Sequence, residues 1–202
     1  MLKPLYLASQ SPRRLELLRQ IGLAPAALYL RNGAGRLDVD ETPLPGEPAM
    51  DYVLRLARLK AEAGDLARHQ RSLAVWPIVA ADTAVTLDGQ ILGKPADAEE
   101  AAAMLRRYSG RSHTVLTGVA VGFKGRLEVA LSESTVRFRE LSDAEIAAYV
   151  ASREPFDKAG GYGIQGRAAM FVEHLNGSYS GVMGLPLCET ARLLEEVGFP
   201  VF

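Results

Sequence analysis

Two long strand-like segments, residues 113–123 and 126–141, are separated only by the Lys-Gly pair at 124–125. Long strand-like segments that meet at a two-residue turn are typical of an antiparallel hairpin. Helical patterns at residues 12–21 and 50–63 alternate with shorter strand-like runs along the rest of the chain. A long hairpin combined with helical crossovers predicts an α/β fold, in which a mixed, curved β-sheet is flanked by helices around a central cleft.

Local signals predict several element boundaries. Gly64 predicts the end of the helix at 50–63, and an apolar strand is predicted over residues 75–81. The Asp88-Gly89 pair predicts a type I′ hairpin turn, and a later strand is expected over residues 168–175. Two more helix starts are predicted where a capping residue is followed three positions later by glutamate, at Asp97 and Ser142.

The composition limits the classes of protein that fit this chain. Its 202 residues carry a net charge of −1, which argues against a general nucleic-acid binder or membrane-surface binder. The single cysteine, Cys188, excludes an intrachain disulfide, and no Cys/His spacing resembles a zinc site. No apolar run approaches the roughly 20 residues of a membrane span, and the N-terminus lacks the apolar core of a signal peptide. We therefore expect one cytoplasmic domain covering residues 1–202.

Ser9, Ser11, Arg13 and Arg14 surround the predicted start of the first helix. Ser11 is a good N-cap, and Pro12 suits the first helical position. Arginines in the first turn oppose the helix dipole, at a cost of roughly 0.3–1 kcal/mol each. Free backbone N–H groups, hydroxyls and guanidinium groups together suit a phosphate. The alternative is that both arginines are solvated surface residues.

Asp82 directly follows an apolar strand, at a position where α/β proteins often bind ligands. It is a candidate general base or metal ligand, although a turn aspartate that satisfies backbone donors is the alternative. Lys60, on the second predicted helix, and Lys94, beside a rigid proline, are candidates for phosphate contacts. For each lysine taken separately, a solvated side chain is the alternative.

Residues 157–166 are rich in glycine, which allows a backbone to approach a ligand closely. Gln165 offers both a donor and an acceptor, as the edge of an amide-like base requires. The alternative is a flexible connector. The segment matches neither the dinucleotide-binding fingerprint nor the P-loop.

The stretch from Asn32 to Pro48 reads as a loop or lid that contains Asp38, Asp40 and Glu41. Together with Asp82, these carboxylates suit Mg²⁺ or Mn²⁺, which prefer oxygen ligands. Basic groups for phosphate and acids for a hard cation make a nucleoside triphosphate, or a similar polyphosphate, a plausible ligand.

Motifs spread along the chain, collinear from about Leu5 to Leu194, resemble the Maf family of nucleoside triphosphate pyrophosphatases. The motifs are LASQSPRR, VDET, LARLKA, AADT, GKP, DKAGGYGIQG, NGSY and VMGLPL. Each fragment alone is weak, but their combination is specific. The resemblance implies an inosine-triphosphatase-like α/β fold with two lobes around a cleft, and a homodimer.

The resemblance also implies a reaction and the residues that carry it. It implies hydrolysis between the α and β phosphates, yielding a nucleoside monophosphate and pyrophosphate, with Mg²⁺ or Mn²⁺ required. Asp82 matches the family's proton acceptor, which activates the attacking water. Other polar residues match family positions around the phosphates and the metal, namely Glu41, Arg14, Lys60 and Lys94. On this basis Glu41 and Asp82 are the expected metal ligands. Ser9, Ser11 and Arg14 at the helix start are the expected phosphate-binding residues, Arg14 on both grounds and the two serines from the residue chemistry given above.

Three positions resemble the branch of the family that acts on dTTP and UTP, with modified pyrimidine nucleotides as a further possibility. They are Arg13, Thr83 and Gln165, where the 7-methyl-GTP branch tends to carry tryptophan, glutamine and glutamate. The chemistry agrees, because a neutral glutamine can pair with the imide edge of uracil or thymine. A glutamate would suit a cationic methylated guanine better.

Two alternatives stay open at this point. The same fold supports pyrophosphatases for modified purine triphosphates. The family is also called septum formation inhibitor, so a non-catalytic, nucleotide-sensing regulator of cell division is the alternative from another class.

Overall fold

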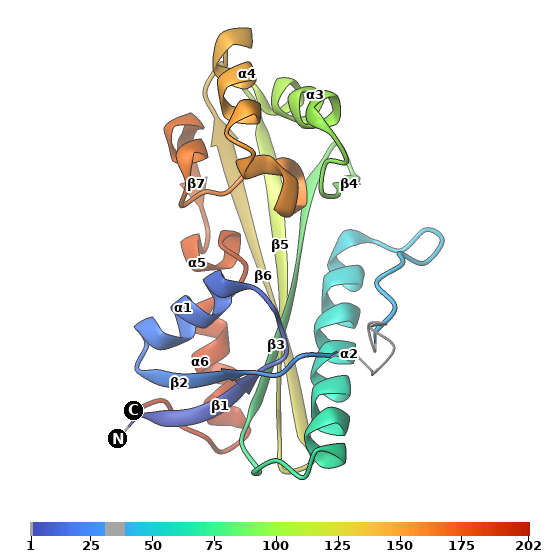
Figure 1. Cartoon of the computed structure of the whole chain (residues 1–202), viewed down its shortest axis with the longest axis vertical. Helices are drawn as coiled ribbons and strands as arrows, with labels where there is room; N and C mark the ends of the chain where they lie inside the picture. Colours follow the sequence, from blue (N-terminus) through green and yellow to red (C-terminus); the bar gives the residue numbers. More distant parts are fainter. Residues whose placement is uncertain (1, 31–38) are drawn as a thin grey trace. The chain divides into compact units, whose positions relative to one another are not determined.

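Strands and helices alternate along residues 2–30 and 39–202, which the computed structural model describes (Figure 1). The strands are β1 (Lys3–Leu7), β2 (Leu23–Ala27), β3 (Ile78–Leu87), β4 (Gln90–Leu92), β5 (Ser112–Phe123), β6 (Arg126–Phe138) and β7 (Val172–Asn176). The α-helices are α1 (Pro12–Gln20), α2 (Ala49–Gln70), α3 (Ala98–Tyr108), α4 (Asp143–Ala151), α5 (Tyr179–Val182) and α6 (Leu187–Glu196). Short 3₁₀ helices are η1 (Glu154–Asp157), η2 (Ala159–Gly161) and η3 (Arg167–Phe171).

The described strands form one sheet in the order β2-β1-β3-β5-β6-β7, and β4 pairs with β3. β1 runs parallel to both β2 and β3, whereas β4 is antiparallel to β3 and β7 is antiparallel to β6. Parallel and antiparallel pairs within one sheet confirm the predicted mixed α/β architecture. The finer prediction, an inosine-triphosphatase-like arrangement of lobes and cleft, stays a prediction.

The chain divides into two compact units, each with its own buried apolar core. The first unit comprises Met1–Asp82, Thr117–Ser132 and Gly184–Phe202, and the second comprises Thr83–Leu116 and Glu133–Met183. Strands β3, β5 and β6 each contribute residues to both units. Because both units are discontinuous in sequence, neither is a simple N-terminal or C-terminal segment. The prediction of a single domain over residues 1–202 is not decided by this division.

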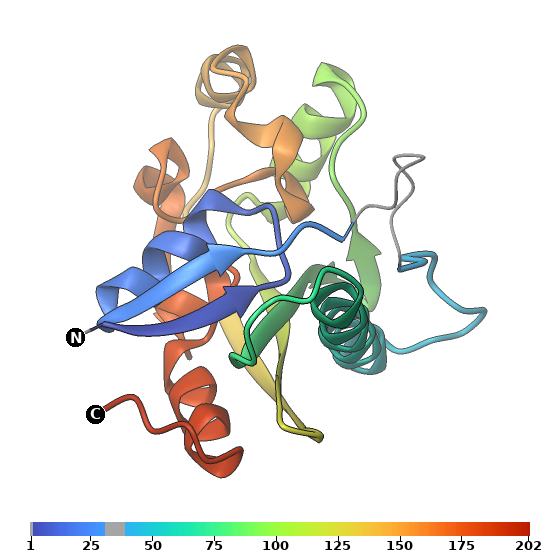
Figure 2. The same cartoon turned by 60° about the horizontal axis from the view of Figure 1, so that its bottom comes forward.

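In the first unit, α2 packs closely against the sheet, and α1 lies beside β2 (Figure 2). Ala57 and Ala61 of α2 are buried in one cluster with Ile78 of β3. Gly118 of β5 permits the closest approach, because a Cβ there would lie 2.7 Å from the carbonyl carbon of Val53. The alanines of α2 and Gly118 of β5 therefore let the helix pack closely against the strands. This close packing fixes the position of α2 on the sheet.

The prediction that Gly64 ends the second helix is wrong, because α2 continues to Gln70. Gly64 is buried inside the helix, where a Cβ would lie 2.9 Å from Cγ2 of Ile78 and 3.3 Å from Cβ of Ala8. The glycine therefore makes room for the strands rather than stopping the helix. Tertiary packing outweighs the roughly 1 kcal/mol that an interior glycine costs relative to alanine.

The strand predicted over residues 75–81 begins later and runs further than expected. β3 starts at Ile78 and continues unbroken through Asp82 to Leu87, where it enters the hairpin. Asp82 therefore lies within a strand, and the expectation that it follows a strand end is wrong. The hairpin turn itself is confirmed, because Asp88 and Gly89 both have the positive φ that a type I′ turn requires, at 54° and 75°.

The predicted helix starts are confirmed, whereas the strand predicted over residues 168–175 is partly wrong. The Asp97 side chain accepts from the N–H of Glu100, and Ser142 forms a capping box with Glu145. Residues 167–171 instead form η3, and β7 begins only at Val172. β7 pairs with β6, with an irregular register between Arg137 and Phe138.

Part of the predicted loop from Asn32 to Pro48 lies outside the described residues, including Asp38. From residue 39 onward, the described part has neither helix nor strand before α2 begins. Among the described residues, no helix combines the length and the hydrophobicity that a membrane-spanning segment requires.

Candidate active site

In the first unit, three of the predicted residues meet through Lys60. The Lys60 ammonium lies 2.7 Å from Oδ1 of Asp82 and 2.7 Å from Oε1 of Glu41. Asp82 is nearly buried, and the Lys60 side chain is only 13% exposed, whereas the Glu41 side chain is 45% exposed. The cluster thus joins a strand, a helix and a loop, and it places two carboxylates around one cation near the surface.

Two side chains of α2 that the sequence analysis did not single out hold the loop carrying Glu41. The Tyr52 hydroxyl donates to the Glu41 carbonyl oxygen at 3.1 Å. Arg55 donates to the Thr42 carbonyl oxygen at 3.2 Å and to both carboxylate oxygens of Glu47, at 2.5 and 2.7 Å. Burial, with the charges of Asp82 and Glu41, raises the pKa of Tyr52 to about 12, so the hydroxyl stays a donor. Glu41 therefore reaches Lys60 on an anchored loop.

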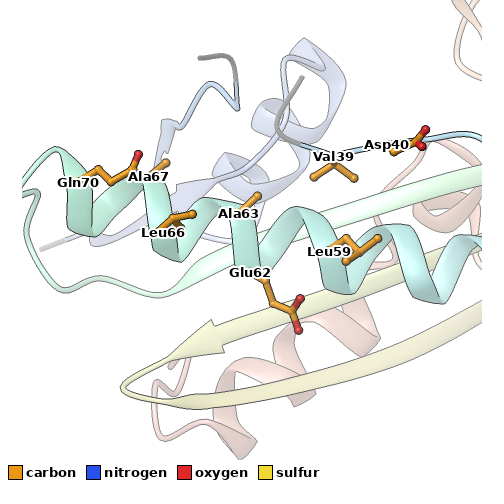
Figure 3. Close-up of a pocket in the computed structure, with 8 residues that line it drawn as sticks. All are labelled: Val39, Asp40, Leu59, Glu62, Ala63, Leu66, Ala67 and Gln70. Atoms are coloured by element: carbon orange, nitrogen blue, oxygen red, sulfur yellow. The ribbon is translucent and has the colours of Figure 1, made fainter. Parts of the chain in front are cut away.

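Asp40 takes a different role from its neighbour. Its Oδ1 accepts from the N–H of Thr42 at 2.9 Å. Hydrogen bonds with the side chain of Thr42 and with this N–H lower the pKa of Asp40. Its side chain also borders a pocket of about 600 Å³ on one face of α2 (Figure 3). That pocket is lined by Val39, Asp40, Leu59, Glu62, Ala63, Leu66, Ala67 and Gln70, and not by Glu41, Lys60 or Asp82. This pocket on α2 is thus lined by other residues than those of the carboxylate cluster.

Arg14 explains why cations stand at the start of α1. Its Nε donates to the Gly184 carbonyl oxygen at 2.7 Å, and its Nη1 donates to the Ala81 carbonyl oxygen at 2.7 Å. Burial lowers the pKa of Arg14, while the negative charges of Asp82 and Glu41 oppose that shift. The guanidinium therefore gains two carbonyl partners and the attraction of two nearby carboxylates, which offset the unfavourable helix dipole. It also brings a second fixed cation to the neighbourhood of Asp82.

The two serines join this cluster unequally. Ser9 Oγ accepts from Arg14 Nη1 at 3.3 Å and from the Ser11 N–H at 3.1 Å. Ser11 is the N-cap residue, as predicted, and Pro12 is the first helical residue, but the Ser11 hydroxyl makes no capping hydrogen bond. Arg13, the next residue of α1, is half-buried and close enough to Arg14 to lower its pKa.

The remaining predicted residues, Thr83, Lys94 and Gln165, belong to the second unit. Lys94 and Gln165 are exposed, and Thr83 is half-buried on β3. A hydrogen bond of 2.9 Å from the Gly160 N–H to the Gly93 carbonyl oxygen links the glycine-rich segment to the residue before Lys94. The structure thus connects the segments of Lys94 and Gln165 to one another.

Aromatic side chains hold the glycine-rich segment in place, so the flexible-connector alternative is wrong. Gly160 to Ile164 are buried, and the Tyr108 hydroxyl donates to the Gly160 carbonyl oxygen at 3.0 Å. His113 Nε2 lies 2.7 Å from the Tyr162 hydroxyl, and both rings pack against Phe138. Burial raises the pKa of both tyrosines. Sequence reasoning missed this support, because His113 carries no motif and Tyr108 reads only as an apolar helix position.

Acid should weaken this aromatic cluster through His113. Burial lowers the pKa of His113 to about 4, and its Nδ1 has no hydrogen-bond partner among the described residues. In the unfolded chain the pKa is about 6.5. The contribution of the neutral His113 ring to the free energy of unfolding is therefore fully present above pH 6.5. It is lost as the pH falls toward 4, and the total loss is about 3 kcal/mol. Urea unfolding between pH 7.5 and 4.5 should show a shallower decline for His113→Gln than for the wild type. If the free energy of unfolding fell equally steeply with pH in both proteins, His113 would not be the source of this acid sensitivity.

Comparisons with known proteins agree with the motifs now placed in the fold. Residues 4–197 match the profile of the family described as Maf-like protein. This chain belongs to the Maf family. A Maf relative from Aromatoleum aromaticum, named dTTP/UTP pyrophosphatase, is 57% identical over 98% of this chain and 97% of its own length. A relative of the same name from Dechloromonas aromatica is 55% identical over 96% of this chain and 98% of its own.

Among solved structures, the Maf chain matches that of the Staphylococcus aureus Ham1 protein, with a TM-score of 0.45 and 16% identity. This match covers 67% of the chain and 72% of the Ham1 chain.

Proposed function

We propose that this Maf protein is a nucleoside triphosphate pyrophosphatase that hydrolyses dTTP and UTP to the monophosphate and pyrophosphate. The observation that carries the proposal is Lys60, whose ammonium is shared by Asp82 and Glu41 at 2.7 Å each. A nearly buried carboxylate beside two fixed cations suits an enzyme that must activate water next to a polyanion. The names of the relatives, at 55% and 57% identity, support the same reaction and substrates.

In the proposed reaction, a water oxygen bonds to the α-phosphorus while the bond from that phosphorus to the α–β bridging oxygen breaks. Asp82 accepts a proton from the water, and pyrophosphate leaves with the bridging oxygen. Lys60 and Arg14 stabilise negative charge on the phosphates, because fixed cations in a partly buried site need little reorganisation. The family resemblance adds Lys94 to this role, and the hydroxyls at the strand-to-helix turn add Ser9 and Ser11 as phosphate contacts.

The donor set suits a divalent cation. Glu41 and Asp82 would hold Mg²⁺ or Mn²⁺, and the Lys60 ammonium between them shows that this carboxylate pair accommodates positive charge. No group of three or more His, Cys, Asp or Glu side chains clusters as a metal site in residues 2–30 and 39–202. Two carboxylates are nevertheless enough for Mg²⁺ when substrate phosphates supply further oxygens. When bound, the cation would neutralise charge on those phosphates.

Selectivity for pyrimidines is assigned to Arg13, Thr83 and Gln165. Gln165 is exposed on the second unit, so its amide is available to pair with the imide edge of uracil or thymine. The expectations of a homodimer and a cytoplasmic location rest on the family resemblance and the composition, and both stay predictions.

A substrate panel tests the proposed function. The purified protein, with Mg²⁺ or Mn²⁺, would be incubated separately with dTTP, UTP, CTP, 7-methyl-GTP and ITP, and the products separated by anion-exchange chromatography. We expect monophosphate and pyrophosphate mainly from dTTP and UTP. Preference for ITP or 7-methyl-GTP would contradict the pyrimidine assignment. Calorimetric binding of nucleotide without turnover of any member of the panel would favour the nucleotide-sensing regulator.

A further inference from the structure

A tight turn at residues 163–166 presents Gln165 on the surface of the second unit. The Gly166 N–H donates to the Gly163 carbonyl oxygen at 2.9 Å, which closes the turn. Of the two residues between them, Ile164 is 5% exposed and Gln165 is exposed. The turn therefore anchors itself through Ile164 and directs Gln165 outward.

Two side chains from the preceding segment hold both ends of this turn. Glu154 of η1 accepts through Oε2 from the Arg167 N–H at 3.1 Å. Tyr149 of α4 accepts from the Gly163 N–H at 3.3 Å and donates to Glu154 Oε1 at 3.0 Å. The Glu154 carboxylate thus accepts a hydrogen bond directly from the backbone N–H after Gln165. It is linked to the backbone N–H before Gln165 through the Tyr149 hydroxyl. Hydrogen bonds to an ionised acceptor are about twice as strong as neutral ones.

Glycine at position 166 makes room for the carboxylate. A Cβ there would overlap the Glu154 side chain, with the carboxyl carbon only 2.6 Å away. The φ of Gly166 is −99°, a value open to any residue, so the space and not the backbone conformation requires glycine. Lys158 holds the other side of Glu154, because its ammonium donates to the Glu154 carbonyl oxygen at 2.8 Å. The space left at Gly166 and the hydrogen bond from Lys158 to the Glu154 backbone therefore both allow the Glu154 carboxylate to lie against the turn.

We propose that Glu154 is a positioning residue for base selectivity, which fixes the direction in which Gln165 faces the pyrimidine. This inference rests on the proposed function, in which Gln165 reads the base. Glu154 itself contacts the turn and not the nucleotide. Its loss should therefore affect the choice of base and the KM more than the rate of phosphate chemistry.

The test compares the kcat/KM ratio of UTP to CTP across variants, because the two bases differ at the edge that Gln165 would read. We expect Gln165→Ala to lower the ratio about tenfold, the effect of one hydrogen bond. Glu154→Ala should lower it to a similar extent, mainly through the KM for UTP, with kcat within about threefold. Glu154→Gln keeps an acceptor for the Arg167 N–H and should restore the ratio to within about threefold of wild type.

A double variant separates positioning from an independent effect. If Glu154 acts through Gln165, the variant carrying both alanine substitutions should have the same ratio as Gln165→Ala alone. Tyr149→Phe removes only the bridging hydroxyl and should shift the ratio in the same direction, which keeps the test valid if Glu154→Ala folds poorly. Glu173→Ala, an exposed glutamate paired with Arg137 in the same unit, is the matched control and should leave the ratio unchanged.

The outcomes distinguish the two proposals. A wild-type protein without turnover of UTP would overturn the proposed function itself. An unchanged ratio in Gln165→Ala would overturn the base-reading role, and the positioning role with it. A lowered ratio in Gln165→Ala, together with unchanged ratios in folded Glu154→Ala and Tyr149→Phe, would overturn the positioning role alone.

Discussion

Asp82→Asn should reduce kcat for dTTP and UTP by about 10²–10⁴-fold, the usual contribution of a general base. Asparagine has the same shape but cannot accept the proton from the attacking water. The fold should survive the change, because Lys60 keeps its ion pair with Glu41 at 2.7 Å. We therefore expect a melting temperature within about 5 °C of the wild type. Release of pyrophosphate from UTP under saturating substrate and Mg²⁺ measures the effect.

The control for Asp82→Asn is Asp88→Asn, which makes the same change of charge six residues along, at the hairpin turn that ends β3. Asp88 is exposed and paired with Arg111, and asparagine tolerates its positive φ of 54°. This control should keep activity close to that of the wild type. If Asp82→Asn did the same, Asp82 would not be the proton acceptor and the proposed mechanism would be wrong.

Lys60→Met should lower kcat/KM for UTP by about 10²–10³-fold, as the loss of one preorganised electrostatic partner commonly does. The change removes the cation that Asp82 and Glu41 share and leaves two carboxylates facing one another. The positive charge of Lys60 is then also missing when the triphosphate binds, so the negative charge of the phosphates is less well stabilised. Methionine has a similar unbranched stem and a good helix propensity, so α2 should keep its structure. Steady-state kinetics with UTP and circular dichroism would report both effects.

Arg58→Met provides the comparison for Lys60→Met on the same helix. Arg58 is exposed and lies two residues before Lys60, outside the carboxylate cluster. Its replacement by methionine removes the same charge from the same helix. Its kcat/KM should stay within about threefold of the wild type. Activity of folded Lys60→Met within the same range would show that the ammonium only pairs with the carboxylates and plays no part in the reaction.

Local signals in the sequence predicted those features whose causes are themselves local. The Asp88-Gly89 turn, the capping interactions at Asp97 and Ser142, and the long hairpin all depend on neighbouring residues. Gly64 shows the limit of such signals, because its role is set by Ile78 and Ala8, which meet the helix only after folding. The unbroken strand through Asp82 was missed for a similar reason, because sheet pairing and not local propensity set its ends.

By itself, the sequence determined the mixed α/β class, most helix starts and, through its motifs, the family and the candidate site residues. Only the tertiary structure decided which of these residues meet. It brought Glu41, Lys60 and Asp82 together from a loop, a helix and a strand, and it gave Arg14 its carbonyl partners. It also revealed Tyr52, His113, Tyr149 and Glu154 as supports. Hydrogen bonds between residues far apart in the chain depend on packing, which no local pattern encodes.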